Sequence, residues 1–76
     1  MQKYYFYIEH AGRHVSQQYK TPDDVIQAID QDTAMRRFAR KHKMRLSGWE
    51  PLIGEGWRAY YMSKGIEHVY YIEEAP

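Results

Sequence analysis

Hydrophobic and polar side chains alternate near the start of the chain in the pattern of a strand with two different faces. Residues 3–9 are rich in aromatic and β-favouring types; Tyr5 and Tyr7 fall on one face, and three other apolar side chains fall on the opposite face. A turn signal at residues 11–13 follows. Weaker alternation over residues 14–20 predicts a return strand at a sheet edge. These patterns indicate an N-terminal β-hairpin.

The second half of the chain carries a similar period-two pattern. Residues 57–63 and 66–73 alternate clearly, and the Lys-Gly pair between them favours a hairpin turn. Residues 46–53 predict a short strand that is interrupted at Pro51. An antiparallel meander is therefore expected here.

Between these regions the sequence Thr21-Pro22-Asp23-Asp24 has the composition of a helix start. The threonine hydroxyl can cap a helix, proline suits the first helical position, and carboxylates suit the positive end of the helix dipole. This signal predicts a helix over residues 22–30.

A second helix is predicted over residues 33–43, with Asp32 or Thr33 as its cap. At about 100° per residue, its apolar side chains point well over a quarter-circle away from those of the first helix. One straight helix cannot aim both sets at one core, so a break between them is expected. The alternative is one long helix whose second face packs on another chain.

The expected fold is α+β, with a single domain spanning residues 1–76. It consists of an antiparallel sheet of four to five strands, built from the N-terminal hairpin and the C-terminal meander, with one or two helices on one face. A chain of 76 residues has a thin stability margin, and the absence of cysteine excludes disulfides and thiolate zinc sites. Self-association as a homodimer, or a permanent partner, is therefore worth testing.

The chain lacks the signals of membrane insertion and export. No apolar run approaches the ~20 residues of a membrane-spanning helix, and the first residues do not have the composition of a signal peptide. Together with the absence of cysteine, this predicts a cytoplasmic protein that makes no membrane contact.

Motifs for catalysis are missing, and we expect no catalytic residue and no cofactor. There is no cysteine nucleophile, no serine elbow and no glycine-rich phosphate loop before a helix. His10 and His14 flank the first turn and would lie near each other, but a metal site needs three or four ligands. We therefore predict a non-enzyme without a metal site.

Charge is concentrated in one segment. Residues 36–48 hold six cations and no acid, whereas the segments before and after it hold more acids than cations. Such a basic helix is either an ordinary solvated face or a contact for an anionic partner, which could be nucleic acid or an acidic protein surface. The cations are Arg36, Arg37, Arg40, Lys41, Lys43 and Arg45.

Tyrosine is the other enriched residue, at eight of 76. Tyr5 and Tyr7, with Tyr60 or Tyr61 and Tyr70 or Tyr71 in the meander, place aromatic side chains on both faces of one sheet. Helices cover only one face, so an aromatic patch remains on the other. It would serve as a protein interface, as cross-strand packing, or as a stacking platform for single-stranded bases.

The predicted layout of a hairpin, the Thr21-Pro22-Asp23-Asp24 helix start and a Trp/Tyr-rich meander resembles that of some anti-CRISPR proteins. These small phage proteins inhibit bacterial CRISPR–Cas complexes by binding them. The helix start after a hairpin is also similar to that of small integrase arm-binding domains. Those domains place three strands before the helix, whereas two are expected here.

The function predicted from these features is that of a non-catalytic binding protein of phage or mobile-element type. It would dock on a larger host complex that handles nucleic acid, such as a CRISPR–Cas effector. The predicted contacts are the six cations together with Tyr5, Tyr7, Tyr60 and Tyr71. The alternative is direct DNA or RNA binding by the basic helix at residues 33–43.

Overall fold

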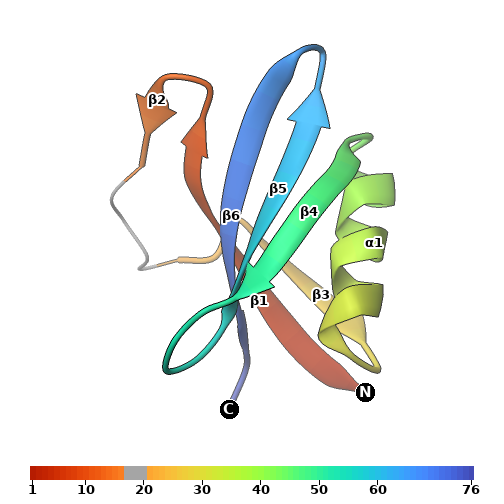
Figure 1. Cartoon of the computed structure of the whole chain (residues 1–76). Helices are drawn as coiled ribbons and strands as arrows, with labels where there is room; N and C mark the ends of the chain where they lie inside the picture. The colour runs from red at the N-terminus through yellow and green to blue at the C-terminus, as the bar shows by residue number, and fades with distance from the viewer. Residues whose placement is uncertain (17–20) are drawn as a thin grey trace.

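One helix packs on one face of a six-stranded antiparallel sheet in the computed structural model, which describes residues 1–16 and 21–76 (Figure 1). The α+β class and the single helix-covered face are thus confirmed. The elements in chain order are β1 (Gln2–Ala11), β2 (His14–Val15), β3 (Asp24–Ala28), α1 (Gln31–Lys41), β4 (Arg45–Pro51), β5 (Trp57–Ser63) and β6 (Ile66–Glu74).

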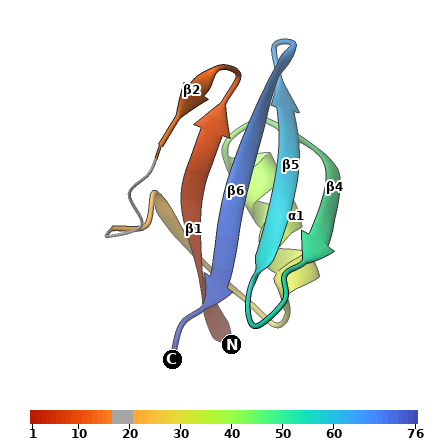
Figure 2. The same cartoon turned by 60° about the vertical axis from the view of Figure 1, so that its left-hand side comes forward.

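Strand β1 lies inside the sheet. It pairs with β6 along one side; on its other side it pairs with β3 through its first half and with β2 through its second half. The remaining order is β6-β5-β4, so β4 forms one edge and β2 and β3 share the other (Figure 2). The first and last strands are therefore neighbours, and the two ends of the chain lie close together (Figure 2).

Aromatic rings fill the core between α1 and the sheet. Phe38 of α1 is fully buried and stacks on Phe6 of β1, with ring centroids 4.4 Å apart and planes 4° from parallel. Tyr70 packs edge-on against Phe38, with ring centroids 4.6 Å apart. The hydroxyl of Tyr61 donates a 2.9 Å hydrogen bond to the backbone oxygen of Met35, and burial raises the pKa of this tyrosine. A small core is thus built largely from stacked rings.

Helix α1 begins where a side chain caps it. Asp30 is the N-cap, and its Oδ1 accepts a 2.8 Å hydrogen bond from the backbone N–H of Thr33, which lowers the pKa of this aspartate. Asp32 lies in the first turn, where a negative charge is favourable. After the C-cap His42, Lys43 has the left-handed φ of +55° that normally favours glycine at this position.

The predicted helix over residues 22–30 is wrong, because Asp24–Ala28 forms β3. The carboxylate of Asp23 accepts a 2.7 Å hydrogen bond from the backbone N–H of Ile8 on β1, instead of lying at a helix N-terminus. The side chains of β3 alternate, with Ile26 and Ala28 buried in the core. The expectation of only two strands before the helix is therefore also wrong, since three precede it.

The other elements agree more closely with the sequence. The helix predicted over residues 33–43 is Gln31–Lys41, and its cap is Asp30 instead of Asp32 or Thr33. The strands expected at residues 3–9, 57–63 and 66–73 are present, and Pro51 ends β4 instead of interrupting it. Of the strand predicted over residues 14–20, His14–Val15 is confirmed, whereas residues 17–20 lie outside the described part.

Candidate binding surfaces

The sheet face opposite α1, here called the open face, gathers the tyrosines that the sequence singled out. Side chains directly opposite one another on paired strands share a face, so the strand register assigns each position. Tyr7, Tyr71, Arg58 and Glu50 form one row across β1, β6, β5 and β4. His10, Val69 and Tyr60 form the next row, and Tyr5 lies opposite Glu73. Tyr61 and Tyr70 belong to the core on the helix side.

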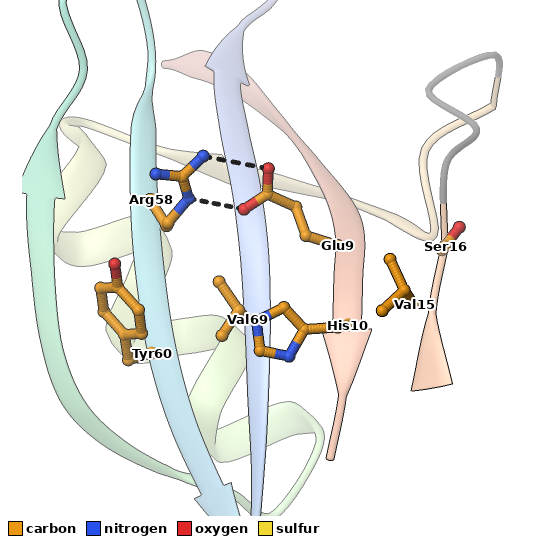
Figure 3. A pocket seen from close by; sticks show the side chains of 7 residues that line it. All are labelled: Glu9, His10, Val15, Ser16, Arg58, Tyr60 and Val69. Atoms are coloured by element: carbon orange, nitrogen blue, oxygen red, sulfur yellow. Dashed lines mark hydrogen bonds and ion pairs between the residues drawn. The ribbon is translucent and has the colours of Figure 1, made fainter. Parts of the chain in front are cut away.

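Arg58 forms the centre of the open face. Its Nε and Nη2 donate to the two carboxylate oxygens of Glu9, at 2.6 Å and 3.2 Å (Figure 3). Glu50 approaches from the other side at 3.9 Å. The hydrogen bond to Glu9 raises the pKa of Arg58, and its side chain is 35% exposed. A bidentate pair of this kind fixes the guanidinium in one orientation.

A β-bulge explains why Glu9 reaches this position. The register of β1 against β6 shifts between Ile8 and His10, so Glu9 is the extra residue. Bulges commonly re-aim a side chain in this way. Sequence analysis did not select Arg58 or Glu9, because they lie 49 positions apart and no local motif links them.

Two hollows flank this ion pair. The larger has a volume of about 550 Å³ and opens to solvent; it is lined by Glu9, His10, Val15, Ser16, Arg58, Tyr60 and Val69 (Figure 3). The second, of about 400 Å³, is lined by Glu9, Leu52, Arg58 and Tyr71. The open face is therefore uneven and presents its polar groups in fixed positions.

The tyrosines of the open face also contact one another and nearby carboxylates. The rings of Tyr7 and Tyr71 lie 5.9 Å apart, and both hydroxyls donate to Glu73 at 3.1 Å. Burial and this hydrogen bond raise the pKa of Tyr71 to about 12. The hydroxyl of Tyr60 donates to Glu50, and this bond raises the pKa of Tyr60. Cross-strand packing is thus part of what these residues do.

The open face carries more negative than positive charge. Four carboxylates lie on it against three cations, Lys3, Arg45 and the paired Arg58. This balance disfavours contact with a phosphate backbone, which needs uncompensated cations. The carboxylates are Glu9, Glu50, Glu67 and Glu73.

The basic segment lies on α1 and the turn that follows it, and several of its cations have partners. Arg36 pairs with Asp32 at 2.9 Å, and Arg37 donates to the backbone oxygen of Gln27 at 2.6 Å. Lys41 pairs with Asp24 at 2.9 Å, which the sequence did not predict because β3 was expected to be helical.

In the described part of the chain, four of the six cations form no ion pair: Arg37, Arg40, Lys43 and Arg45. Asp32 and Asp24 thus neutralise Arg36 and Lys41, and among the described residues four of the six charges remain unneutralised for an anionic partner.

The two candidate surfaces do not join into one. Helix α1 covers one side of the sheet, whereas Tyr5, Tyr7, Tyr60 and Tyr71 lie on the other (Figure 2). Arg45 is the exception, because it lies opposite Met62 and shares the open face. A flat partner that contacted all the predicted residues at once is excluded by this geometry.

The arrangement of the described side chains gives no support for a metal site. Among the residues that the structure describes, no group of three or more His, Cys, Asp or Glu side chains could hold an ion. His10 and His14 occupy adjacent rungs of the β1–β2 ladder, so their side chains lie on opposite faces.

Comparisons with known protein families, with curated proteins and with solved structures give no match for this chain. Within residues 1–16 and 21–76, no helix is long and apolar enough to span a membrane. Any functional conclusion therefore depends on the two surfaces described above.

Proposed function

We propose that this protein is a non-catalytic binding domain that docks on a larger protein through its open face. The supporting observation is the row of residues centred on Arg58, which joins the buried Tyr7 and the half-buried Tyr71 to an arginine held in place by Glu9. Tyrosine, methionine and arginine are the residue types enriched in protein interfaces. Tyr5, Tyr60 and Met62 supply such a surface, and α1 lies on the opposite side.

Rigidity favours binding at this face. The paired guanidinium and the bonded Tyr60 hydroxyl lose little conformational freedom when a partner arrives. The hollow beside Arg58 offers a place for one protruding side chain, and the surplus of carboxylates favours a basic one. The helix start at residues 21–24 no longer carries the resemblance to anti-CRISPR proteins, because this segment leads into β3. The small size and the Trp/Tyr-rich meander still do, so a bacterial CRISPR–Cas effector is the first complex to test.

Truncation of the half-buried Tyr5 and Tyr60 tests this proposal. The tagged protein and a Tyr5→Ala/Tyr60→Ala variant are compared in pull-downs from bacterial lysate, with and without nuclease. A matched Arg36→Ala/Arg40→Ala variant changes only the helix side. One stoichiometric protein partner that survives nuclease and the helix variant, and is lost with the tyrosine variant, is the expected result. Equal recovery with both variants would refute docking through the open face.

Affinity for the purified partner makes the same comparison quantitative. Hot-spot residues, among which tyrosine is enriched, cost about 2 kcal/mol or more when truncated, so the tyrosine variant should bind at least about tenfold more weakly. Circular dichroism on each variant controls for loss of the fold.

The second candidate function is direct DNA or RNA binding by the end of α1. Its supporting observation is that Arg40 and Lys43 form no ion pair among the described residues, and that Lys43 stands where glycine would be less strained. Together with Arg45, they provide three phosphate contacts and a log–log salt slope of about −2 to −3. An Arg40→Glu/Lys43→Glu variant should lose this binding, whereas Tyr5→Ala/Tyr60→Ala should keep it.

A further inference from the structure

The two edges of the sheet differ in whether their backbones are already occupied. On β3, the carboxylate of Asp24 accepts from the backbone N–H of Val25 at 2.8 Å, and Arg37 donates to the backbone oxygen of Gln27 at 2.6 Å. On β4, Ser47 donates inward to Tyr60 of β5. Across the described residues, no other group outside the β4–β5 ladder bonds to the β4 backbone. An open edge of this kind is a template for another strand.

A bulge gives β4 an unusual arrangement of faces. Arg45 lies opposite Met62 and Glu50 opposite Arg58, so both side chains belong to the open face. Positions five apart fall on opposite faces of a regular strand, and only the extra residue, Ser47, brings these two to the same face.

On the helix side of β4, the bulge likewise brings two residues to the same face that would lie on opposite faces of a regular strand. Leu46 lies opposite Tyr61 and Trp49 opposite Ala59, so both apolar side chains lie on that side. Trp49 is 41% exposed and Leu46 is half-buried, which leaves apolar area beside the strand.

The side chains of β4 are consequently arranged so that a second copy of β4 would present opposite charges to its charged residues and apolar groups to its apolar residues. If a second β4 runs antiparallel, with the two-fold axis between Ser47 and Gly48, Arg45 lies opposite the partner's Glu50. Leu46 then lies opposite the partner's Trp49. Each pairing occurs twice, and in both the paired side chains share a face, as a closed two-fold dimer requires.

We propose that two copies of this chain pair through β4 into one continuous antiparallel sheet. Glu50 is suited to the contact because its side chain is 49% exposed and only its Oε2 is engaged by Tyr60 and Arg58. Arg45 forms no ion pair in the part of the chain that the structure describes, so it is available as well. The occupant is a second copy and not a foreign strand, because both pairings match β4 against itself. Figure 2 shows β4 at the margin of the sheet.

Sedimentation velocity over a range of concentrations tests the pairing. The wild-type mass should rise with concentration from 9.2 kDa towards twice that value. Arg45→Glu places two like-charged pairs across the axis and should weaken the dimer by about tenfold or more. Trp49→Lys should weaken it by a similar factor. Val25→Lys is the matched control on the occupied edge, since Val25 is 42% exposed, and it should leave the dimer unchanged.

Mixing two charge variants provides a result that a merely structural effect cannot give. Arg45→Glu and Glu50→Lys should each be monomeric, because each places like charges opposite one another. Their mixture restores opposite charges in both pairs and should dimerise. Circular dichroism confirms that each variant is folded.

Two outcomes would overturn the proposal. The first is a wild-type chain that stays monomeric at the highest concentration tested. This result would overturn the proposal even if a strand of another protein bound at β4. The second is a dimer that is insensitive to both Arg45→Glu and Trp49→Lys. Neither outcome bears on binding at the open face, which is tested with Tyr5 and Tyr60.

Discussion

The carboxylate of Asp24 joins β3 to the end of α1, and its removal should cost much of the stability. It accepts from the backbone N–H of Val25 at 2.8 Å, from Nζ of Lys41 at 2.9 Å and from Nε2 of His42 at 2.7 Å. The side chain is only 12% exposed. Asp24→Asn keeps the size of the side chain and removes its charge, so the change isolates the electrostatic contribution.

The expected loss follows from these contacts. A hydrogen bond to a charged group contributes about 1.5–3 kcal/mol. Asp24→Asn weakens the two bonds from Lys41 and His42, while the amide oxygen of the new asparagine can still accept one hydrogen bond. We expect a loss of about 2–4 kcal/mol in the free energy of unfolding. A chain of this length has about 4–11 kcal/mol in total, so the loss is a large fraction.

The pH dependence of this loss has a definite sign. Burial raises the pKa of Asp24, but hydrogen bonds from His42 and Lys41 outweigh it and hold the pKa below its ordinary value. The ionised form is therefore favoured by folding. Its contribution is complete above the pKa of the unfolded chain and is lost as the pH falls through the folded-state pKa. The difference between wild type and Asp24→Asn should thus be present at neutral pH and shrink below about pH 4.

Urea unfolding followed by tryptophan fluorescence at several pH values measures this difference. Glu67→Gln is the control, because Glu67 is exposed and should change the unfolding free energy by less than about 0.5 kcal/mol. A loss below about 0.5 kcal/mol at neutral pH, or a difference that grows in acid, would refute the reasoning.

Five further substitutions test the core and the turns by the same urea titration. Phe38→Ala should cost about 3–5 kcal/mol, because it removes a fully buried ring from the core; a loss below about 1 kcal/mol would mean that the neighbouring rings close the cavity. Tyr61→Phe should cost about 0.5–1.5 kcal/mol through the lost bond to the helix backbone, and no change would contradict that bond. Gly56→Ala should be more destabilising than Gly54→Ala: both have positive φ, but only at Gly56 would the new Cβ meet a β6 backbone oxygen at 2.8 Å. Lys43→Gly should stabilise by about 0.5–1 kcal/mol by relieving left-handed strain, and a loss would show that the lysine side chain is itself stabilising.

Period-two alternation was sufficient to predict the strands that carry the open face. Residues 57–63 and 66–73 were assigned correctly because their alternation, their turn and their β-favouring side chains all agree. The phase argument against one long helix was also informative, because the side chains around Ile26 do belong to a different element from Phe38.

The failure at residues 22–30 has a specific cause. Aspartates after a proline favour a helix N-terminus, yet here Asp23 bonds to β1 and Asp24 bonds to the end of α1. Both partners are distant in sequence, so no local pattern reveals them. The same limit hid the pairing of Arg58 with Glu9, which depends on the β1–β6–β5 order and on a bulge.

The pairing of β1 with β6 also determines how this chain can fold. Tyr4 lies opposite Glu74, so β1 is completed only by β6, which lies about 60 residues further along the chain. Contacts between residues so far apart in sequence close large loops, which slows folding relative to local hairpins. A nascent chain therefore cannot bury Phe6 against Ile72 until β6 has left the ribosome. The aromatic side chains of β1 should thus stay exposed to chaperones until β6 is available to pair with them.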